Sequence, residues 1–195
     1  MPIGVLALQG DFREHIAVLE KLQTDAIAVR TKAELDRCSA LIIPGGESTV
    51  MQKLSVAYDL FDPIKQKITS GFPVFGTCAG LIMLADEIID GIEGQFGFGG
   101  LDVAVRRNAF GNQLDSFEDD LDFEGITTPI HAAFIRAPIV ERVGDNVKVL
   151  SKLDDGRIVA VRSGNLLGIS FHPEVTWELR VHEYFLGMVA ASKAS

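Results

Sequence analysis

Short apolar runs alternate with amphipathic stretches along most of this chain. The runs have the length of β-strands, and stretches between them repeat apolar residues every three or four positions, as one face of a helix does. The helical spacing is clearest at Phe12, Ile16, Leu19 and Leu22, and again at Phe61, Ile64 and Ile68. The runs that we predict as strands cover residues 3–8, 26–30, 40–43, 73–76, 101–106, 147–150, 158–162 and 166–171.

This order predicts an α/β fold with a mostly parallel central sheet and helices on both faces. We expect antiparallel pairs among the later, shorter strands. Neither a repeat nor a low-complexity linker interrupts the pattern, so residues 1–195 are treated as one domain. Ligands of such sheets bind beyond the carboxyl ends of the strands, which makes the segments just after the strands the place to look for chemistry.

Composition narrows the class of protein. With 195 residues, 47% of them hydrophobic, the chain can bury a full core, and its apolar runs stay below the roughly 18 residues of a membrane span. The N-terminal segment has neither the basic region nor the cleavage site of a secretory signal. A net charge of −9 without Lys/Arg clusters argues against nucleic-acid binding. Two cysteines in different contexts, Cys38 and Cys78, suit a reducing cytoplasm and give no metal-ligand cluster.

Cys78 stands where a strand turns sharply into a helix. The sequence Gly-Thr-Cys-Ala-Gly at 76–80 follows the apolar run 73–75 and leads into the apolar residues 81–85. A strained turn needs residues without a Cβ around the nucleophile, and a helix start offers N–H groups that favour a thiolate. The pattern predicts a nucleophile elbow with Cys78 as the catalyst. The alternative is a buried structural cysteine, since free cysteine commonly packs as a small hydrophobe.

A second candidate motif, Phe-His-Pro-Glu at 171–174, closes the apolar run 166–170. A histidine at a strand end can reach across a sheet to a thiol, and a carboxylate on one imidazole nitrogen leaves the other to take the proton from sulfur. His172 and Glu174 therefore complete a Cys-His-acid triad with Cys78. Taken alone, His172 could cap a loop, and Glu174 could be an ordinary solvated carboxylate.

The third motif is Pro-Gly-Gly-Glu-Ser at 44–48, directly after the run 40–43. Its glycines allow backbone N–H groups to face an oxyanion, and Ser48 or Thr49 can cap a helix expected from about 49 to 54. Alone, the segment fits a plain glycine-rich turn better. It lacks the lysine of a phosphate-binding loop.

Together and in this order, the three motifs resemble a class I, triad-type glutamine amidotransferase domain, whose fold is flavodoxin-like. Further segments resemble the glutaminase subunits of pyridoxal 5′-phosphate synthase, which serve vitamin B6 synthesis. These segments are 4–10 with Arg13, Glu14 and His15, then 107–111, 115–118 and 134–138. The resemblance spans about residues 3–190 and includes all three triad positions.

The resemblance implies hydrolysis of L-glutamine to L-glutamate and ammonia by Cys78, His172 and Glu174, with no cofactor or metal. The oxyanion is assigned to the backbone N–H groups of Gly46 and Ala79. An arginine suits the substrate's α-carboxylate, although by themselves the two arginines of this set would pass for surface ion pairs. The matched family positions of the glutamine site are Gly46, Glu47, Ser48, Arg107, Ile135 and Arg136.

The resemblance also implies a partner, a (β/α)8-barrel synthase subunit that receives the ammonia, assembles pyridoxal 5′-phosphate from ribose 5-phosphate and glyceraldehyde 3-phosphate, and switches the glutaminase on. Gln9, Gly10 and the first helix are expected to contact this partner.

Two alternatives stay open: an enzyme with a similar elbow that serves another pathway, and a non-enzymatic binding module. We assign no role to residues 95–100 and no catalytic role to His15, His131 or His182. The acidic run 115–124 is expected to be a solvated loop or strand surface.

Overall fold

The computed structural model describes residues 1–109 and 116–194. Residues 110, 111 and 115 of the motifs above lie outside this part of the chain. Seven helices are described: α1 Phe12–Lys21, α2 Lys32–Asp36, α3 Ser48–Ala57, α4 Phe61–Thr69, α5 Ala79–Leu84, α6 Pro173–Thr176 and α7 Leu179–Ser192. None of the helices in these two ranges is long and apolar enough to cross a membrane.

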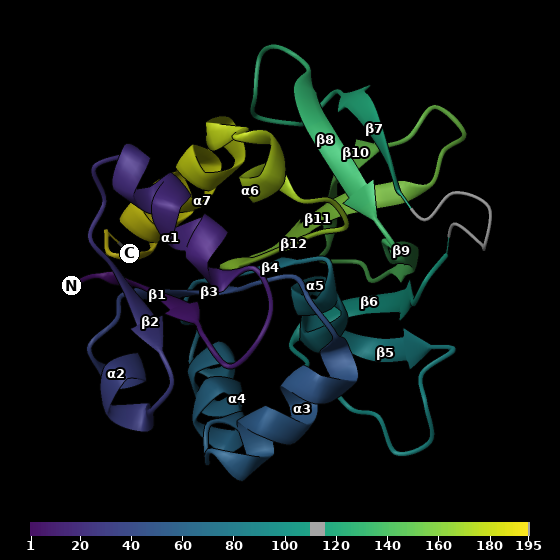
Figure 1. The fold of residues 1–195 in the computed structure, drawn as a ribbon. Coiled ribbons are helices and arrows are strands. Elements are labelled where there is room, and N and C mark those ends of the chain that lie inside the picture. The colour runs from purple at the N-terminus through teal and green to yellow at the C-terminus, as the bar shows by residue number, and fades with distance from the viewer. Residues whose placement is uncertain (110–115, 195) are drawn as a thin grey trace.

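The described strands comprise one large sheet and one hairpin (Figure 1). Their bounds are β1 Ile3–Leu6, β2 Ala26–Val29, β3 Ala40–Ile43, β4 Val74–Thr77, β5 Ala85–Ile89, β6 Leu101–Arg106, β7 Ser116–Leu121, β8 Ile130–Ile135, β9 Ile139–Val143, β10 Lys148–Lys152, β11 Ile158–Ser163 and β12 Leu166–Ile169. The large sheet has the order β2-β1-β3-β4-β12-β11-β9-β6-β5, with β10 paired to β11. β7 and β8 pair with each other outside it.

The first half of the large sheet is parallel, and the second half is mixed. β2, β1, β3, β4 and β12 all run in the same direction, whereas β11 is antiparallel to β12, β9 and β10. The predictions of a mostly parallel sheet and of antiparallel pairs among the later strands are both confirmed. Parallel strands are possible early in the chain because helices there provide the crossovers.

Helices cover both faces of the parallel strands, as predicted. Alternate residues of β3 show the division: Ala40 and Ile42 pack in one apolar cluster with α1 and α7, whereas Leu41 and Ile43 pack in the other cluster with α3, α4 and α5. Figure 1 shows the two helical layers above and below the strands. Burial on both faces explains why these strands read as continuous apolar runs.

The prediction missed β5, β8 and β9. β5 follows α5 without a connecting turn, so the apolar run after Cys78 gave no sign of where the helix ended. β8 and β9 are separated by three residues that include Pro138. The acidic run does form a strand surface: β7 alternates the half-buried Phe117 with the exposed Glu118 and places its other face toward solvent.

Candidate active site

The four neighbouring parallel strands β1, β3, β4 and β12 end at one edge of the sheet. The segments after them carry Asp11, Gly46, Cys78 and His172, and all four residues line one cavity of about 520 Å³. The further lining residues are Glu47, Ser48, Ala79, Ile82, Arg107, Asn108, Ile135, Arg136 and Val175. A single crevice therefore collects every predicted site residue except Glu174, which is buried behind His172.

Cys78 lies in a strained elbow. Its backbone has φ 50° and ψ −102°, a conformation that a residue with a Cβ rarely adopts. A Cβ on Gly76 would lie 2.5 Å from the backbone of Gly80, and a Cβ on Gly80 would lie 2.1 Å from the carbonyl oxygen of Ile43. The two glycines are needed because α5 packs directly against β3 and β4. This close packing holds Cys78 in the lining of the cavity, where the residue is 7% exposed.

His172 is placed to exchange a proton with Cys78. Its Nδ1 lies 2.7 Å from Oε1 of Glu174, which leaves Nε2 for the sulfur. Burial lowers the pKa of His172, but the hydrogen bonds with Cys78 and Glu174, and the negative charges of both groups, outweigh burial and raise that pKa to about 10. The site therefore favours the protonated imidazolium form of His172, which can give its proton to a leaving group.

Glu174 is almost fully buried. Burial raises its pKa, and the hydrogen bond and charge of His172 oppose that effect. Its second oxygen, Oε2, has no hydrogen-bond partner among the residues described. Asp11 stands close by, with Oδ2 3.6 Å from Nδ1 of His172.

In residues 1–109 and 116–194, one cluster has the spacing of a metal site. Ligand atoms of Asp11, His172 and Glu174 lie within 4.8 Å of one another. Nδ1 of His172 is already paired with Oε1 of Glu174 at 2.7 Å, which is the distance of a charge-assisted hydrogen bond. The cluster fits a proton-transfer site better than a metal site.

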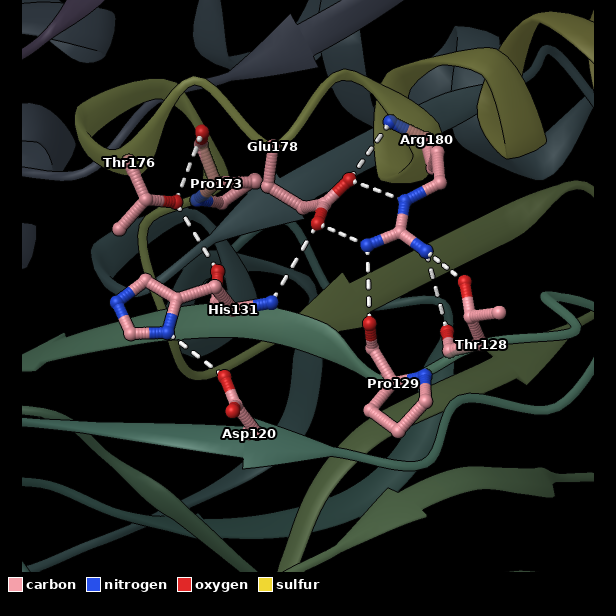
Figure 2. A network of polar contacts seen from close by, with 8 residues as sticks. All are labelled: Asp120, Thr128, Pro129, His131, Pro173, Thr176, Glu178 and Arg180. Atoms are coloured by element: carbon pink, nitrogen blue, oxygen red, sulfur yellow. Dashed lines mark hydrogen bonds and ion pairs between the residues drawn. The ribbon is translucent and has the colours of Figure 1, made fainter.

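A network of polar contacts connects α6 and the residues just after it to β8 and the residues just before it (Figure 2). The N–H of His172 donates to the carbonyl of Ala133 at 2.8 Å, and the hydroxyl of Thr176 donates to the carbonyl of His131 at 3.1 Å. Glu178 pairs with Arg180, whose guanidinium also donates to the carbonyls of Thr128 and Pro129 at 3.2 and 3.0 Å. These contacts fix α6 relative to the strand that ends at Ile135.

Glu47, rather than Ser48 or Thr49, caps α3. Its carboxylate accepts from the N–H of Val50 at 2.9 Å, and the helix runs to Ala57, beyond the predicted end at about 54. Ser48, the first residue of the helix, is buried and 1% exposed. The N–H of Glu47 donates to Oε1 of Gln9 at 2.8 Å, which connects this turn to the segment after β1.

Arg107 is held in the cavity wall by two acceptors. Its guanidinium donates to Oε1 of Gln95 at 2.7 Å and to Oε1 of Glu47 at 2.9 Å. The amide nitrogen of Gln95 in turn donates to Oγ of Ser48 at 2.9 Å. Gln95, to which sequence reasoning gave no role, therefore connects two predicted substrate-binding residues.

Left-handed backbone recurs along the cavity. Asn108 has φ 46° and Arg136 has φ 44°, and both residues line the cavity with Cys78. The carbonyl of Ile135 lies 3.9 Å from the sulfur of Cys78. Unfavourable backbone conformations that gather at one place are typical of a functional site.

Comparison with known proteins agrees with the site. Residues 5–191 match the model of the SNO glutamine amidotransferase family. The chain belongs to this family. The pyridoxal 5′-phosphate synthase subunit PdxT of a Nocardioides species is 57% identical over 195 residues, covering 98% of this chain and 97% of that protein. PdxT of Leifsonia xyli is 59% identical over 185 residues, covering 94% and 93%.

Solved structures agree with the family assignment. A crystal structure described as a glutamine amidotransferase superposes with a TM-score of 0.92 at 47% identity and covers 97% of this chain and 100% of that one. A glutamine amidotransferase of Thermotoga maritima superposes with a TM-score of 0.61 at 15% identity, covering 100% of this chain and 87% of that one, and shares the fold. The mixed α/β architecture of class I amidotransferases is thereby confirmed.

Two groups near the site escaped sequence reasoning. Gln95 lies in a Gly/Phe-rich loop with no motif of its own. His15 and His182 lie on helices, at positions where the helical pattern predicts buried core residues, and both are 0% exposed. The one available signal was that a histidine is an uncommon choice for a fully buried helix position.

A second cavity, of about 620 Å³, lies beside Gln95–Gly100 and is larger than the candidate site. Cys78, His172 and Glu174 do not line it.

Proposed function

We propose that the 520 Å³ cavity is a glutaminase site in which Cys78 is the nucleophile, His172 the acid and base, and Glu174 the group that orients His172. The chain is the glutaminase subunit that supplies ammonia for the synthesis of pyridoxal 5′-phosphate. The observation that carries the site assignment is the buried 2.7 Å pair of His172 Nδ1 and Glu174 Oε1, which orients the other imidazole nitrogen toward the strained Cys78.

The proposed reaction has two halves. The thiolate of Cys78 attacks the carbon of the side-chain amide, and the proton on His172 passes to the departing ammonia, which leaves a thioester on the sulfur. His172 then takes a proton from water, the hydroxide attacks the thioester, and glutamate leaves as the sulfur is freed. Ala79 begins α5, where an N–H has no acceptor one turn earlier, and it would hold the oxyanion together with the N–H of Gly46.

The remaining predicted residues would bind the substrate. Arg107 already has acceptors in Glu47 and Gln95, so it is fixed in place before glutamine arrives. Arg136 is exposed at the rim and supplies a second cation near Ile135. We assign the α-carboxylate of glutamine to these arginines, because a planar guanidinium can bind a carboxylate with two hydrogen bonds. Gly46, Glu47 and Ser48 would line the adjoining part of the cavity, where Glu47 accepts a hydrogen bond from Arg107.

The ammonia released in this reaction needs a partner that uses it. The ammonia would pass to a (β/α)8-barrel synthase subunit that joins it to ribose 5-phosphate and glyceraldehyde 3-phosphate. We expect residues 1–195 to act as one glutaminase domain in the cytoplasm, where the thiol of Cys78 stays reduced. The proposed chemistry uses no cofactor and no metal.

Replacement of the nucleophile tests the proposal. We expect Cys78→Ala to abolish glutamine hydrolysis in the presence of synthase while the circular dichroism spectrum stays unchanged, because the variant keeps the fold but cannot form a thioester. His172→Asn should be more damaging than Glu174→Gln, since the histidine moves the proton. Normal turnover by folded Cys78→Ala would refute the assignment.

A further inference from the structure

Two buried histidines lie directly behind the triad. His15 from α1 and His182 from α7 are each 0% exposed, and Nδ1 of His15 lies 2.9 Å from Nε2 of His182. On its other side, Nε2 of His15 lies 3.1 Å from Oγ1 of Thr77 and 3.6 Å from Oε2 of Glu174. That carboxylate oxygen is the one without a hydrogen-bond partner in the described part of the chain.

Both histidines are neutral at physiological pH. Burial, followed by the charges of His182 and His172, lowers the pKa of His15 well below its ordinary value, and burial lowers the pKa of His182 to about 3. A neutral imidazole carries one N–H and one bare nitrogen. The contact between the two rings therefore has to be an N–H on one ring and a lone pair on the other.

Two buried atoms without a hydrogen-bond partner, Oε2 of Glu174 and Nδ1 of His182, indicate which ring donates the hydrogen bond between the histidines. If His15 donated from Nδ1, its bare Nε2 would face the Glu174 carboxylate, and the buried Nδ1–H of His182 would have no acceptor, since that nitrogen has no partner in residues 1–109 and 116–194. If His182 donates from Nε2, His15 carries its proton on Nε2, between Thr77 and Glu174. The second arrangement avoids a lone pair against an anion and leaves no buried N–H without a partner.

We propose that His15 is a positioning residue of the triad: His182 fixes the tautomer in which the Nε2–H of His15 faces Oε2 of Glu174, and this dipole keeps the carboxylate charged and oriented toward His172. At 3.6 Å the contact is longer than a hydrogen bond, so it acts through electrostatics, which are strong in a buried site. The proposal rests on the proposed role of Glu174.

The sign of the effect follows from the neighbouring charges. The titratable groups that act on Glu174 and His15 come from different segments of the chain: Asp11, His172 and His182. The negative charge of Asp11 also raises the pKa of Glu174. Loss of the His15 N–H would raise that pKa further and favour the protonated carboxyl group. A protonated Glu174 no longer stabilises the imidazolium, and the pKa of His172 falls.

The test compares His15→Phe, which keeps a ring but removes both nitrogens, with His15→Gln, whose amide N–H can replace the Nε2–H. The readout is the pKa of His172, followed by NMR of its imidazole carbons. We expect His15→Phe to lower that pKa by about one unit and to reduce kcat about tenfold, with KM within about twofold. His15→Gln should restore most of both values.

Val189→Ala is the matched control, because it removes buried volume from α7 without touching the network. It should lower the melting temperature and leave the His172 titration unchanged. If His15→Phe does not fold, His182→Leu removes the donor that fixes the tautomer and should shift the His172 pKa in the same direction. An unchanged His172 pKa in whichever of the two variants folds would overturn the proposal.

The two proposals can fail separately. The NMR titration does not depend on turnover, so it reports on His15 even if the chain has no glutaminase activity. Failure of the proposed function would instead appear as normal hydrolysis by Cys78→Ala.

Discussion

The pKa of His172 depends on two neighbouring side chains. Glu174 and Cys78 both stabilise the imidazolium and together raise its pKa to about 10, against the opposing effect of burial. In the first half of the proposed reaction this proton goes to the departing ammonia. We therefore expect the pH range of catalysis to depend on the carboxylate of Glu174, which is buried behind His172.

We expect Glu174→Gln to shift the alkaline limb of the glutaminase pH profile to lower pH. The substitution removes the negative charge that raises the pKa of His172, so the imidazolium loses its proton at a lower pH than in the parent chain. The measurement is kcat/KM for glutamine between about pH 6 and about pH 11 with saturating synthase. An alkaline limb at the same pH in both proteins would show that Glu174 does not control His172.

Arg107 is expected to bind substrate rather than to activate the thiol. Arg107→Ala should raise the apparent KM for glutamine about tenfold or more, since a hydrogen bond to a charged group contributes about 1.5–3 kcal/mol. Arg136→Ala should act in the same direction. The alkylation rate of Cys78 by iodoacetamide should stay within about twofold in both. Arg142→Ala is the control, because its ion pair with Asp102 is exposed and worth little.

Gln95 should act through Arg107. Gln95→Ala removes the 2.7 Å contact to the guanidinium and should raise the KM for glutamine less than Arg107→Ala does. Once Arg107 is absent, removal of Gln95 should have little further effect on KM, because the two residues share one task. Fully additive effects in the double variant would mean that Gln95 acts independently.

At the scale of elements, the elbow depends on how closely α5 approaches β3. Gly80 contributes the contact: its backbone packs where a Cβ would lie 2.1 Å from the carbonyl of Ile43. Gly187 in α7 is the opposite case, with nothing within 4 Å of an added Cβ. Substitution by alanine therefore tests close packing at Gly80 and helix propensity at Gly187.

We expect Gly80→Ala to destabilise the fold by about 3 kcal/mol or more, since a backbone carbonyl cannot move aside. Gly187→Ala should stabilise it by about 0.5–1 kcal/mol, because alanine loses less conformational entropy in a helix. The check is urea unfolding of both variants. Equal stability of the two would contradict the packing at Gly80.

At the scale of the whole molecule, the sheet order explains why three distant motifs meet. β3, β4 and β12 are neighbours and parallel, so the segments that follow them open at one edge (Figure 1). Gln9, after β1, reaches the same edge and holds the N–H of Glu47. A partner that docks beside Gln9 and Gly10 would contact the turn that contains the proposed oxyanion donor Gly46.

We expect the isolated chain to be a poor glutaminase that its synthase activates. A glycine peptide at 45–46 can reorient at low steric cost, so docking can turn an N–H toward the oxyanion. The measurement is glutamate production across a synthase titration, with Gln9→Ala as the interface probe. Full activity without synthase would refute the switch and leave the triad chemistry standing.

Much of the architecture was readable in the sequence because its signals are local. Apolar runs of strand length, helical spacing at Phe12 to Leu22 and the Gly-x-Cys-x-Gly turn each depend on neighbours along the chain. β5, β8 and β9 were missed because nothing in their own residues separates them from a helix end or a proline-bounded loop. Their strand character comes from partners distant in sequence, which is a tertiary effect.

The sequence by itself determined the α/β class and predicted the residues of a Cys-His-Glu triad, because the elbow, the base and the acid each lie in a short motif of neighbouring residues. Only the tertiary structure decided what surrounds them. It brought Gln95 into contact with Arg107, and it placed His15 and His182 beside Glu174. These residues come from segments that share no sequence motif. Burial and distance, which give those side chains their charge state and partners, exist only after the sheet and both helical layers have assembled.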